Sequence, residues 1–305
     1  MFTASDWSNY GPGLIEQQLY SVTTGLSVES ASSPQRTSNT GKIEQVLDNS
    51  DYQNLKFDLS PDGQAIVVQR VNRLNVDDAG LWVWRENAPW QPLLKQAGGD
   101  FLIAPDSATL ANTQGEGVSI VPLIPQAKPL DFLPQFSQVL AFSRDGVQAA
   151  MVKSNSDATR SLFWVTNRGV EKELIRISGE FVDGEFDPSG QKLYCLMDRV
   201  LENEQQLAVA VIDLKTLKVE PLIVLPKQRG DIEMSLSPDG LALLFDRVSI
   251  KETLPANDDL TTSAGSAIAS SRLWLLPLEE KTSKSANPTL QQELPLQGFH
   301  PHWLP

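Results

Sequence analysis

The side chains that most often carry acid–base or metal chemistry are scarce in this chain. It has two histidines, His300 and His302, and one cysteine, Cys195. Two positions apart on a strand, the histidines would point to the same side, as metal ligands sometimes do. Without a neighbouring cysteine or a third histidine, we interpret them as polar residues of a strand and predict no metal site. Cys195 lies in the apolar run KLYCLM, which indicates a buried, unreactive thiol.

The common catalytic signatures are also missing. The sequence contains no G-x-S-x-G elbow, P-loop, G-x-G-x-x-G, C-x-x-C or H-E-x-x-H pattern. Such patterns place a nucleophile, a phosphate cradle or a metal in a defined geometry. We therefore predict no catalytic residue and no cofactor, and we leave open an enzyme whose site has no recognisable pattern.

An arginine recurs at the end of three apolar runs. The tripeptides are Gln69-Arg70-Val71, Asp198-Arg199-Val200 and Asp246-Arg247-Val248. Equivalent positions in a repeated fold would bring the three arginines to one face of the molecule. Two interpretations follow: ion pairs with neighbouring carboxylates, or a basic ring that binds an anionic group.

One segment near the N-terminus combines aromatic residues with glycine. Residues 7–13 read WSNYGPG and would form a loop between two strands. Trp7 and Tyr10 are candidate binding contacts, because aromatic side chains with a polar tip are common at interfaces. The alternative is that they pack beneath neighbouring strands.

The composition narrows the choice of partners. The chain has 25 Lys and Arg against 38 Asp and Glu, a net charge of −13. A chain this acidic repels phosphate backbones, and no stripe of Lys and Arg offsets the charge, so we predict no nucleic-acid partner. No run approaches the roughly 20 apolar residues of a membrane span.

A short corner motif repeats along the chain. Its clearest copies, residues 60–63 and 237–240, read SPDG. Proline presets φ at the first central position of a turn, aspartate caps the local backbone, and glycine accepts a positive φ. The motif therefore predicts a tight turn between two strands. The copies occupy residues 60–63, 104–107, 143–146, 187–190 and 237–240, and their second positions, continued to Pro301, are 44, 39, 44, 50 and 63 residues apart.

Each corner belongs to a unit that predicts four strands. LKFDLS and AIVVQ flank the first corner, and GLWVWR and WQPLLKQ follow it. Four short strands in a unit of about forty residues are typical of a propeller blade. We predict an all-β fold: a single six-bladed β-propeller over residues 1–305, with four-stranded antiparallel blades. Residues 1–48 and 298–305 would together build the sixth, seam blade and close the ring.

Two further expectations depend on this architecture. Asp183, Glu185 and Asp187 alternate along one innermost strand, so lining a central channel explains them more simply than paired-carboxylate catalysis. The connections that follow the second strands vary most, and the longest spans residues 249–271. These loops would gather on the face opposite the corners, where binding residues are often found.

The repeats resemble the TolB-like, WD-type β-propeller repeats, which have an S-P-D-G core followed by L-W-V or L-W-L. The matching segments are Ser60–Val68 with Leu81-Trp82-Val83, Ser237–Phe245 with Leu273-Trp274-Leu275, Ser143–Val152 with Leu162-Phe163-Trp164, and Pro301-His302-Trp303. The resemblance covers the whole chain and implies a free-standing propeller, since the chain has no room for the N-terminal domain of TolB itself. It indicates a fold and leaves the function open.

These observations favour a non-enzymatic scaffold that binds a partner protein through the variable-loop face. The alternatives are a small-molecule or anion binder at the channel mouth, or an enzyme within the channel. The oligomeric state is not predicted. The chain as given indicates a cytoplasmic protein, whereas the resemblance points to the periplasm. Residues 1–5, MFTAS, would be a second strand already under way, which predicts a natural start, with a targeting segment, further upstream.

Overall fold

Every regular element in the described part of the chain is a β-strand. The computed structural model describes residues 2–5, 17–22, 43–45, 52–72, 74–75, 77–85, 88–95, 99–114, 117–127, 136–201, 204–225, 232–250, 268–278, 291–296 and 298–303. Within these residues no helix is long and apolar enough to span a membrane.

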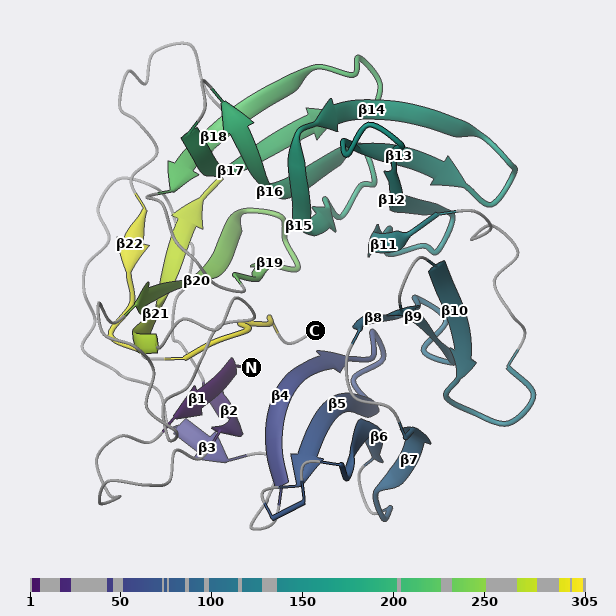
Figure 1. The fold of residues 1–305 in the computed structure, drawn as a ribbon, viewed down its shortest axis with the longest axis vertical. Helices are drawn as coiled ribbons and strands as arrows, with labels where there is room; N and C mark the ends of the chain where they lie inside the picture. Colours follow the sequence, from purple (N-terminus) through teal and green to yellow (C-terminus); the bar gives the residue numbers. More distant parts are fainter. Residues whose placement is uncertain are drawn as a thin grey trace.

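Five antiparallel sheets surround the centre of the molecule as blades, each beginning with a strand that ends in a corner (Figure 1). Four blades have four strands and one has three. The blades are β4(Tyr52–Leu59), β5(Ala65–Asn72), β6(Ala79–Arg85), β7(Gln91–Leu94); β8(Asp100–Ile103), β9(Thr109–Gln114), β10(Gly117–Pro122); β11(Gln138–Phe142), β12(Gln148–Ser154), β13(Arg160–Thr166), β14(Glu171–Ile177); β15(Gly179–Phe186), β16(Lys192–Leu201), β17(Glu204–Asp213), β18(Val219–Leu225); and β19(Met234–Leu236), β20(Ala242–Ile250), β21(Ile268–Pro277), β22(Gln292–Glu293).

The corners share one turn geometry. In each, the backbone N–H of the fourth residue donates to the carbonyl of the first, at 2.7 to 2.9 Å. The fourth residue has positive φ in every copy, from 54° at Ser107 to 75° at Gly240. Where the first residue is serine, its hydroxyl donates to the aspartate two positions later, as Ser60 does to Asp62 at 2.7 Å. The residue types of the motif therefore serve the turn itself.

Apolar residues alternate along each strand and fill the spaces between blades. On β16, Leu193, Cys195 and Met197 pack toward the blade β11–β14. The intervening Tyr194 and Leu196 pack toward the blade β19–β22. Because successive side chains of a strand point to opposite faces, one strand contributes to two cores. This two-sided burial fixes the order of the blades around the centre.

The predicted blade count is wrong. We expected six four-stranded blades, the sixth built from residues 1–48 and 298–305, whereas the described part of the chain forms five. The N-terminal strands β1(Phe2–Ser5), β2(Gln17–Val22) and β3(Ile43–Gln45) form a sheet of three. Among the described residues, no strand of the C-terminal segment is hydrogen-bonded into that sheet.

The local chemistry of the C-terminal segment explains the difference. Pro301 has no backbone N–H to give to a ladder. His300 has a φ of 50°, which turns the backbone out of the extended conformation. The backbone N–H of Trp303 donates to the Ser235 hydroxyl at 3.1 Å, and its indole N–H to the Ser235 carbonyl at 3.1 Å. The segment is therefore hydrogen-bonded to β19 and does not supply the predicted seam strand.

The blade β8–β10 also departs from expectation, with three strands. The fourth run predicted for it falls on residues 127–134, and residues 128–134 lie outside the described part of the chain.

Two equivalent corner glycines give a matched test of the turn. Gly240 has a φ of 75°, and a Cβ there would lie 2.8 Å from Pro188 Cδ; Gly146 has a φ of 69°, and its nearest neighbour would be Pro105 Cβ at an ordinary 3.5 Å. Both alanine variants should lose about 1 kcal/mol of unfolding free energy from the left-handed backbone. Gly240→Ala should lose about 1–3 kcal/mol more, because the proline ring of the neighbouring blade cannot yield. Urea unfolding measures both, and equal losses would contradict the inter-blade contact.

Candidate functional site

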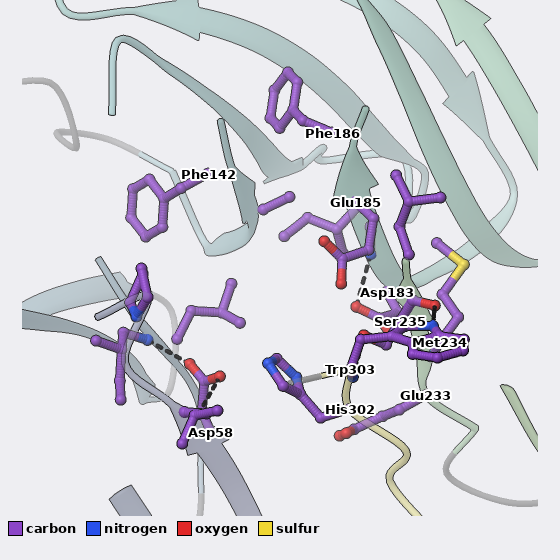
Figure 2. Close-up of a pocket in the computed structure, with 18 of the residues that line it drawn as sticks. Asp58, Phe142, Asp183, Glu185, Phe186, Glu233, Met234, Ser235, His302 and Trp303 are labelled. Carbon is purple, nitrogen blue, oxygen red and sulfur yellow. Dashed lines mark hydrogen bonds between the residues drawn. The ribbon is translucent and has the colours of Figure 1, made fainter. Parts of the chain in front are cut away.

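A cavity of about 300 Å³ lies at the centre of the propeller, on the side of the corners. It is lined by the innermost strands β4, β8, β11, β15 and β19, by corner prolines, and by residues 301–303. Figure 2 shows the Glu185 carboxylate and the His302 imidazole directed into the same space, with Phe142 and Phe186 at the end away from Glu233. The corner side of the channel is therefore hollow, with both polar and aromatic walls.

Four charged residues occupy the same position in four blades. Lys56, Asp100, Asp183 and Glu233 each precede the first residue of their corner by four positions, and all four line the cavity. We call them the charged ring. In the fifth blade the equivalent residue is Val139, so the ring has an apolar gap at β11.

Lys56 connects three blades through the charged ring. Its ammonium contacts the Asp100 carboxylate, and it lies 2.8 Å from Glu233 Oε1. Burial alone would lower the pKa of Lys56, but Glu233 and Asp100 outweigh it and raise that pKa well above its usual value. Burial would likewise raise the pKa of Glu233, but Lys56 and His300 hold it far below the usual range. Both groups are therefore charged at neutral pH.

Two aspartates join neighbouring innermost strands. Asp58 accepts the N–H of Leu59 at 2.8 Å and that of Ile103, in the next blade, at 2.6 Å. Asp183 accepts the N–H of the residue after it at 2.7 Å and that of Met234, in the next blade, also at 2.7 Å. We call this arrangement the aspartate clasp. Each carboxylate satisfies a backbone donor that the centre of the ring would otherwise leave unpaired.

Several carboxyl groups that line the cavity are buried, and burial disfavours their ionised forms. Burial raises the pKa of Asp58 to about 6, against the backbone hydrogen bonds that favour its ionised form. Burial, with Glu233 nearby, raises the pKa of Asp183 well above its usual value. Burial, with Asp183 and Asp58 nearby, does the same to Glu185. Burial therefore favours the protonated forms of Asp183 and Glu185 on the β15 side of the cavity, and a bound cation would favour their ionised forms.

The two histidines lie in different surroundings. His302 lines the cavity, with its ring centroid 6.3 Å from that of Phe57, and burial lowers its pKa to about 4. His300 lies next to Glu233, with its Nδ1 3.2 Å from Glu233 Oε2. No group of three or more His, Cys, Asp or Glu side chains in the described ranges is placed to hold a metal ion.

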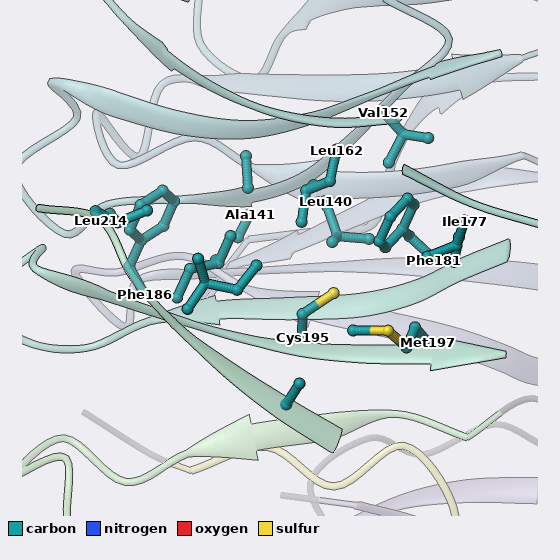
Figure 3. Close-up of a cluster of buried hydrophobic side chains, with 14 residues drawn as sticks. Leu140, Ala141, Val152, Leu162, Ile177, Phe181, Phe186, Cys195, Met197 and Leu214 are labelled. Carbon is teal, nitrogen blue, oxygen red and sulfur yellow. The ribbon is translucent and has the colours of Figure 1, made fainter. Parts of the chain in front are cut away.

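Cys195 takes no part in the cavity. Figure 3 shows its side chain among the apolar residues between the blades β11–β14 and β15–β18. Burial raises the pKa of its thiol well above the usual value, which removes the reactive thiolate.

The three recurring arginines do not line the cavity. The Arg70 guanidinium carbon lies 4.1 Å from the ring centroid of Trp90 and 4.3 Å from that of Tyr52. Arg247 is placed in the same way over Trp274, at 4.4 Å. Arg199 lies on β16 with its Nε buried. Arg70 and Arg247 thus contact aromatic rings of their own blades, whereas Trp7 and Tyr10 lie outside the described residues.

Sequence reasoning identified part of this site. Asp183 and Glu185 line the channel as expected, whereas Asp187 caps its corner by accepting the N–H groups of Gln191 and Lys192 at 2.7 Å. Lys56 and Glu233 were missed. Aligning the innermost strands on their corners would have shown charged residues at one position in four repeats. That alignment was available from the sequence.

Comparison with solved structures places the fold. A putative TolB from Agrobacterium tumefaciens aligns over 85% of this chain and 86% of its own, with 15% identity and a TM-score of 0.52. TolB from Acinetobacter baumannii aligns over 79% of this chain and 55% of its own, with 14% identity and a TM-score of 0.51. The fold is that of a TolB-like β-propeller. The resemblance inferred from the repeats is confirmed at this level. No protein-family model matches the sequence, and no curated protein is detectably similar to it.

Replacing Lys56 by methionine tests the charged ring of this TolB-like propeller. The variant leaves Glu233 and Asp100 without their shared cation, and we expect a loss of about 3 kcal/mol of unfolding free energy at pH 7. Because the folded-state pKa of Glu233 is lowered, its charge stabilises the wild type above pH ~4.5, and this contribution is lost as the pH falls. The deficit of Lys56→Met should therefore shrink toward pH 3. Chemical unfolding at both pH values checks this, and a deficit independent of pH would contradict it.

Proposed function

We propose that this protein is a non-enzymatic binding propeller, and that its corner-side cavity receives a positively charged side chain of a partner protein. The observation that carries the proposal is the excess of acids among the residues that line the cavity. Five are carboxylic, Asp58, Asp100, Asp183, Glu185 and Glu233, against the cations Lys56 and Arg144. Lys56 is already engaged by Asp100 and Glu233.

The remaining carboxyl groups have the hydrogen bonding expected of a preformed cation site. Within the described residues, Asp58 and Asp183 accept hydrogen bonds from backbone N–H groups, and Glu185 accepts one from Leu236. These bonds fix the carboxyl groups in place and favour their ionised forms against the effect of burial. A cation that enters the cavity would favour ionisation further and would be attracted to that charge in surroundings of low dielectric constant.

The shape of the cavity favours a long aliphatic cation. Its volume of about 300 Å³ is at the lower end of the range for small-ligand sites. Phe142 and Phe186 line the same cavity as the carboxyl groups, at the end away from Glu233 (Figure 2). A lysine side chain offers an apolar stem for these rings and an ammonium for the acids. An anion finds far less support, since Arg70, Arg199 and Arg247 are not among the lining residues.

A second contact on the variable-loop face has support from one observation. Leu74 is 95% exposed, yet the turn that carries it is held by the Asn72 side chain, which accepts the N–H groups of Leu74 and Asn75. A fixed turn that presents a large apolar side chain loses little conformational entropy on binding. Most of the longest loop on this face, residues 251–267, lies outside the described residues.

A single lysine tests the cavity directly. We expect N-acetyl-lysine methylamide to bind with a Kd on the order of 1 mM, which is ordinary for one side chain. The same compound acetylated at Nζ should bind at least about tenfold more weakly, because it lacks the charge. Glu185→Gln should weaken binding of the charged compound, and Leu74→Asp, on the other face, serves as the matched control. Chemical-shift titration measures all four, and equal binding of the charged and acetylated compounds would rule out the cation site.

The two surfaces predict different losses in a capture experiment. Tagged wild-type protein, Glu185→Gln and Leu74→Asp are each exposed to extract from the native cell, and the captured proteins are quantified by mass spectrometry. A partner that uses the cavity should fall about tenfold with Glu185→Gln and remain with Leu74→Asp. A partner that uses the loop face shows the opposite pattern. Capture that neither variant changes would contradict both surfaces.

A further inference from the structure

Residues 298–303 cross the centre of the propeller as a strap that forms part of the cavity wall. The Gly298 carbonyl accepts the Ser271 hydroxyl at 2.6 Å, and Phe299 is 5% exposed. At the other end, Trp303 is held by its two hydrogen bonds to Ser235. Pro301, His302 and Trp303 all line the cavity. Movement of this strap would therefore change the size and chemistry of the site.

One ionic contact lies in the middle of the strap. His300 Nδ1 is 3.2 Å from Glu233 Oε2, and the His300 side chain is 15% exposed. The His300 backbone has a φ of 50°, a conformation that non-glycine residues adopt at a cost. The strap is thus bent at the residue that makes the contact. The contact with Glu233 is placed to offset part of that cost.

The charged groups around His300 come from several elements. Glu233 precedes β19, Asp246 lies on β20, Lys56 lies on β4 at the far side of Glu233, and Asp100 on β8 contacts Lys56. Asp246 is fully buried, and its Oδ1 accepts the Glu233 N–H at 2.8 Å. Its Oδ2 has no hydrogen-bond partner among the described residues. When His300 is protonated, its charge therefore lies near the carboxyl groups of Glu233 and Asp246. The Lys56 ammonium contacts the other oxygen of Glu233.

The protonation of this cluster changes near neutral pH. Burial would lower the pKa of His300, but Glu233 and Asp246 raise it above its usual value. Burial raises the pKa of Asp246 to about 7, although His300 opposes the shift. His300 therefore binds its proton more tightly in the docked strap, next to Glu233 and Asp246, than in a released one. The His300 proton therefore stabilises the docked strap fully below the ordinary histidine pKa of about 6.5. This stabilisation is lost as the pH rises through the raised pKa of His300 in the docked strap.

We infer that the 298–303 segment is a strap that the His300–Glu233 contact holds in the cavity at mildly acidic pH and that is released as the pH rises above neutral. Release removes His302 and Trp303 from the cavity wall and widens the entrance to the carboxyl groups. The docking constant should fall by up to about tenfold per pH unit for each proton lost. The functional consequence rests on the cavity being the binding site proposed above, whereas the release itself does not.

The Trp303 indole N–H reports directly on docking, because it donates to the Ser235 carbonyl. In protein labelled with ¹⁵N-tryptophan, seven indole signals are expected, one for each tryptophan. The signal that disappears in Trp303→Phe identifies Trp303. Between pH 5.5 and 8.5 this signal should move or broaden in a single transition above pH ~6.5. A Trp303 signal that is constant over this range would overturn the inference.

Two variants test the assignment to His300. His300→Gln keeps a polar side chain without a titrating ring and should abolish the transition. Asp246→Asn removes a carboxylate that supports the His300 charge and should move the midpoint to lower pH. A midpoint in either variant equal to that of the wild type would refute the assignment.

The strap and the proposed function can fail separately. The indole titration needs no ligand, so a missing transition together with binding of N-acetyl-lysine methylamide refutes the strap alone. A transition without binding of that compound refutes the cation site alone. If both hold, affinity for the compound should rise with pH over the same interval in which the Trp303 signal changes.

Discussion

A single lysine at the centre of the ring is the interaction on which the rest of this site depends. Lys56 joins the first blade to Asp100 in the second and to Glu233 in the last. Placing that many carboxyl groups together in a partly desolvated channel would be prohibitive without a cation among them. The ammonium keeps Glu233 ionised, and ionised Glu233 in turn holds His300. The strap and the charged ring are therefore electrostatically coupled through Glu233.

The aspartate clasps answer a different constraint at the same place. Innermost strands of a propeller diverge from one another, so they cannot form a ladder across the gap between blades. Asp58 and Asp183 reach across it and accept the N–H groups of Ile103 and Met234. Their burial raises their pKa values. The ionisation of the two carboxyl groups that join the blades can therefore change when a ligand enters the cavity.

The sequence predicts the parts of this structure that local chemistry determines. Corner residues such as Pro61 and Gly240 indicate their turn because φ is a property of single residues. The blade count failed because closure depends on where Trp303 donates its N–H groups, and that partner, Ser235, is 68 residues away. Lys56 was missed for a different reason. Within LKFDLS alone it resembles the polar side of a strand, and only an alignment of the repeats on their corners shows that charged residues recur at its position.

Repetition of the fold explains how five similar blades produce one asymmetric site. The position four residues before each corner carries Lys, Asp, Val, Asp and Glu in turn. The repeated backbone brings these positions together, and their different side chains make each wall of the cavity distinct. At the blade with Val139, the lining residues are Leu140, Ala141 and Phe142, whereas β15 supplies Asp183 and Glu185. A ligand that matches both walls must be apolar along one part and cationic at one end. The lysine side chain proposed above as the occupant has both properties.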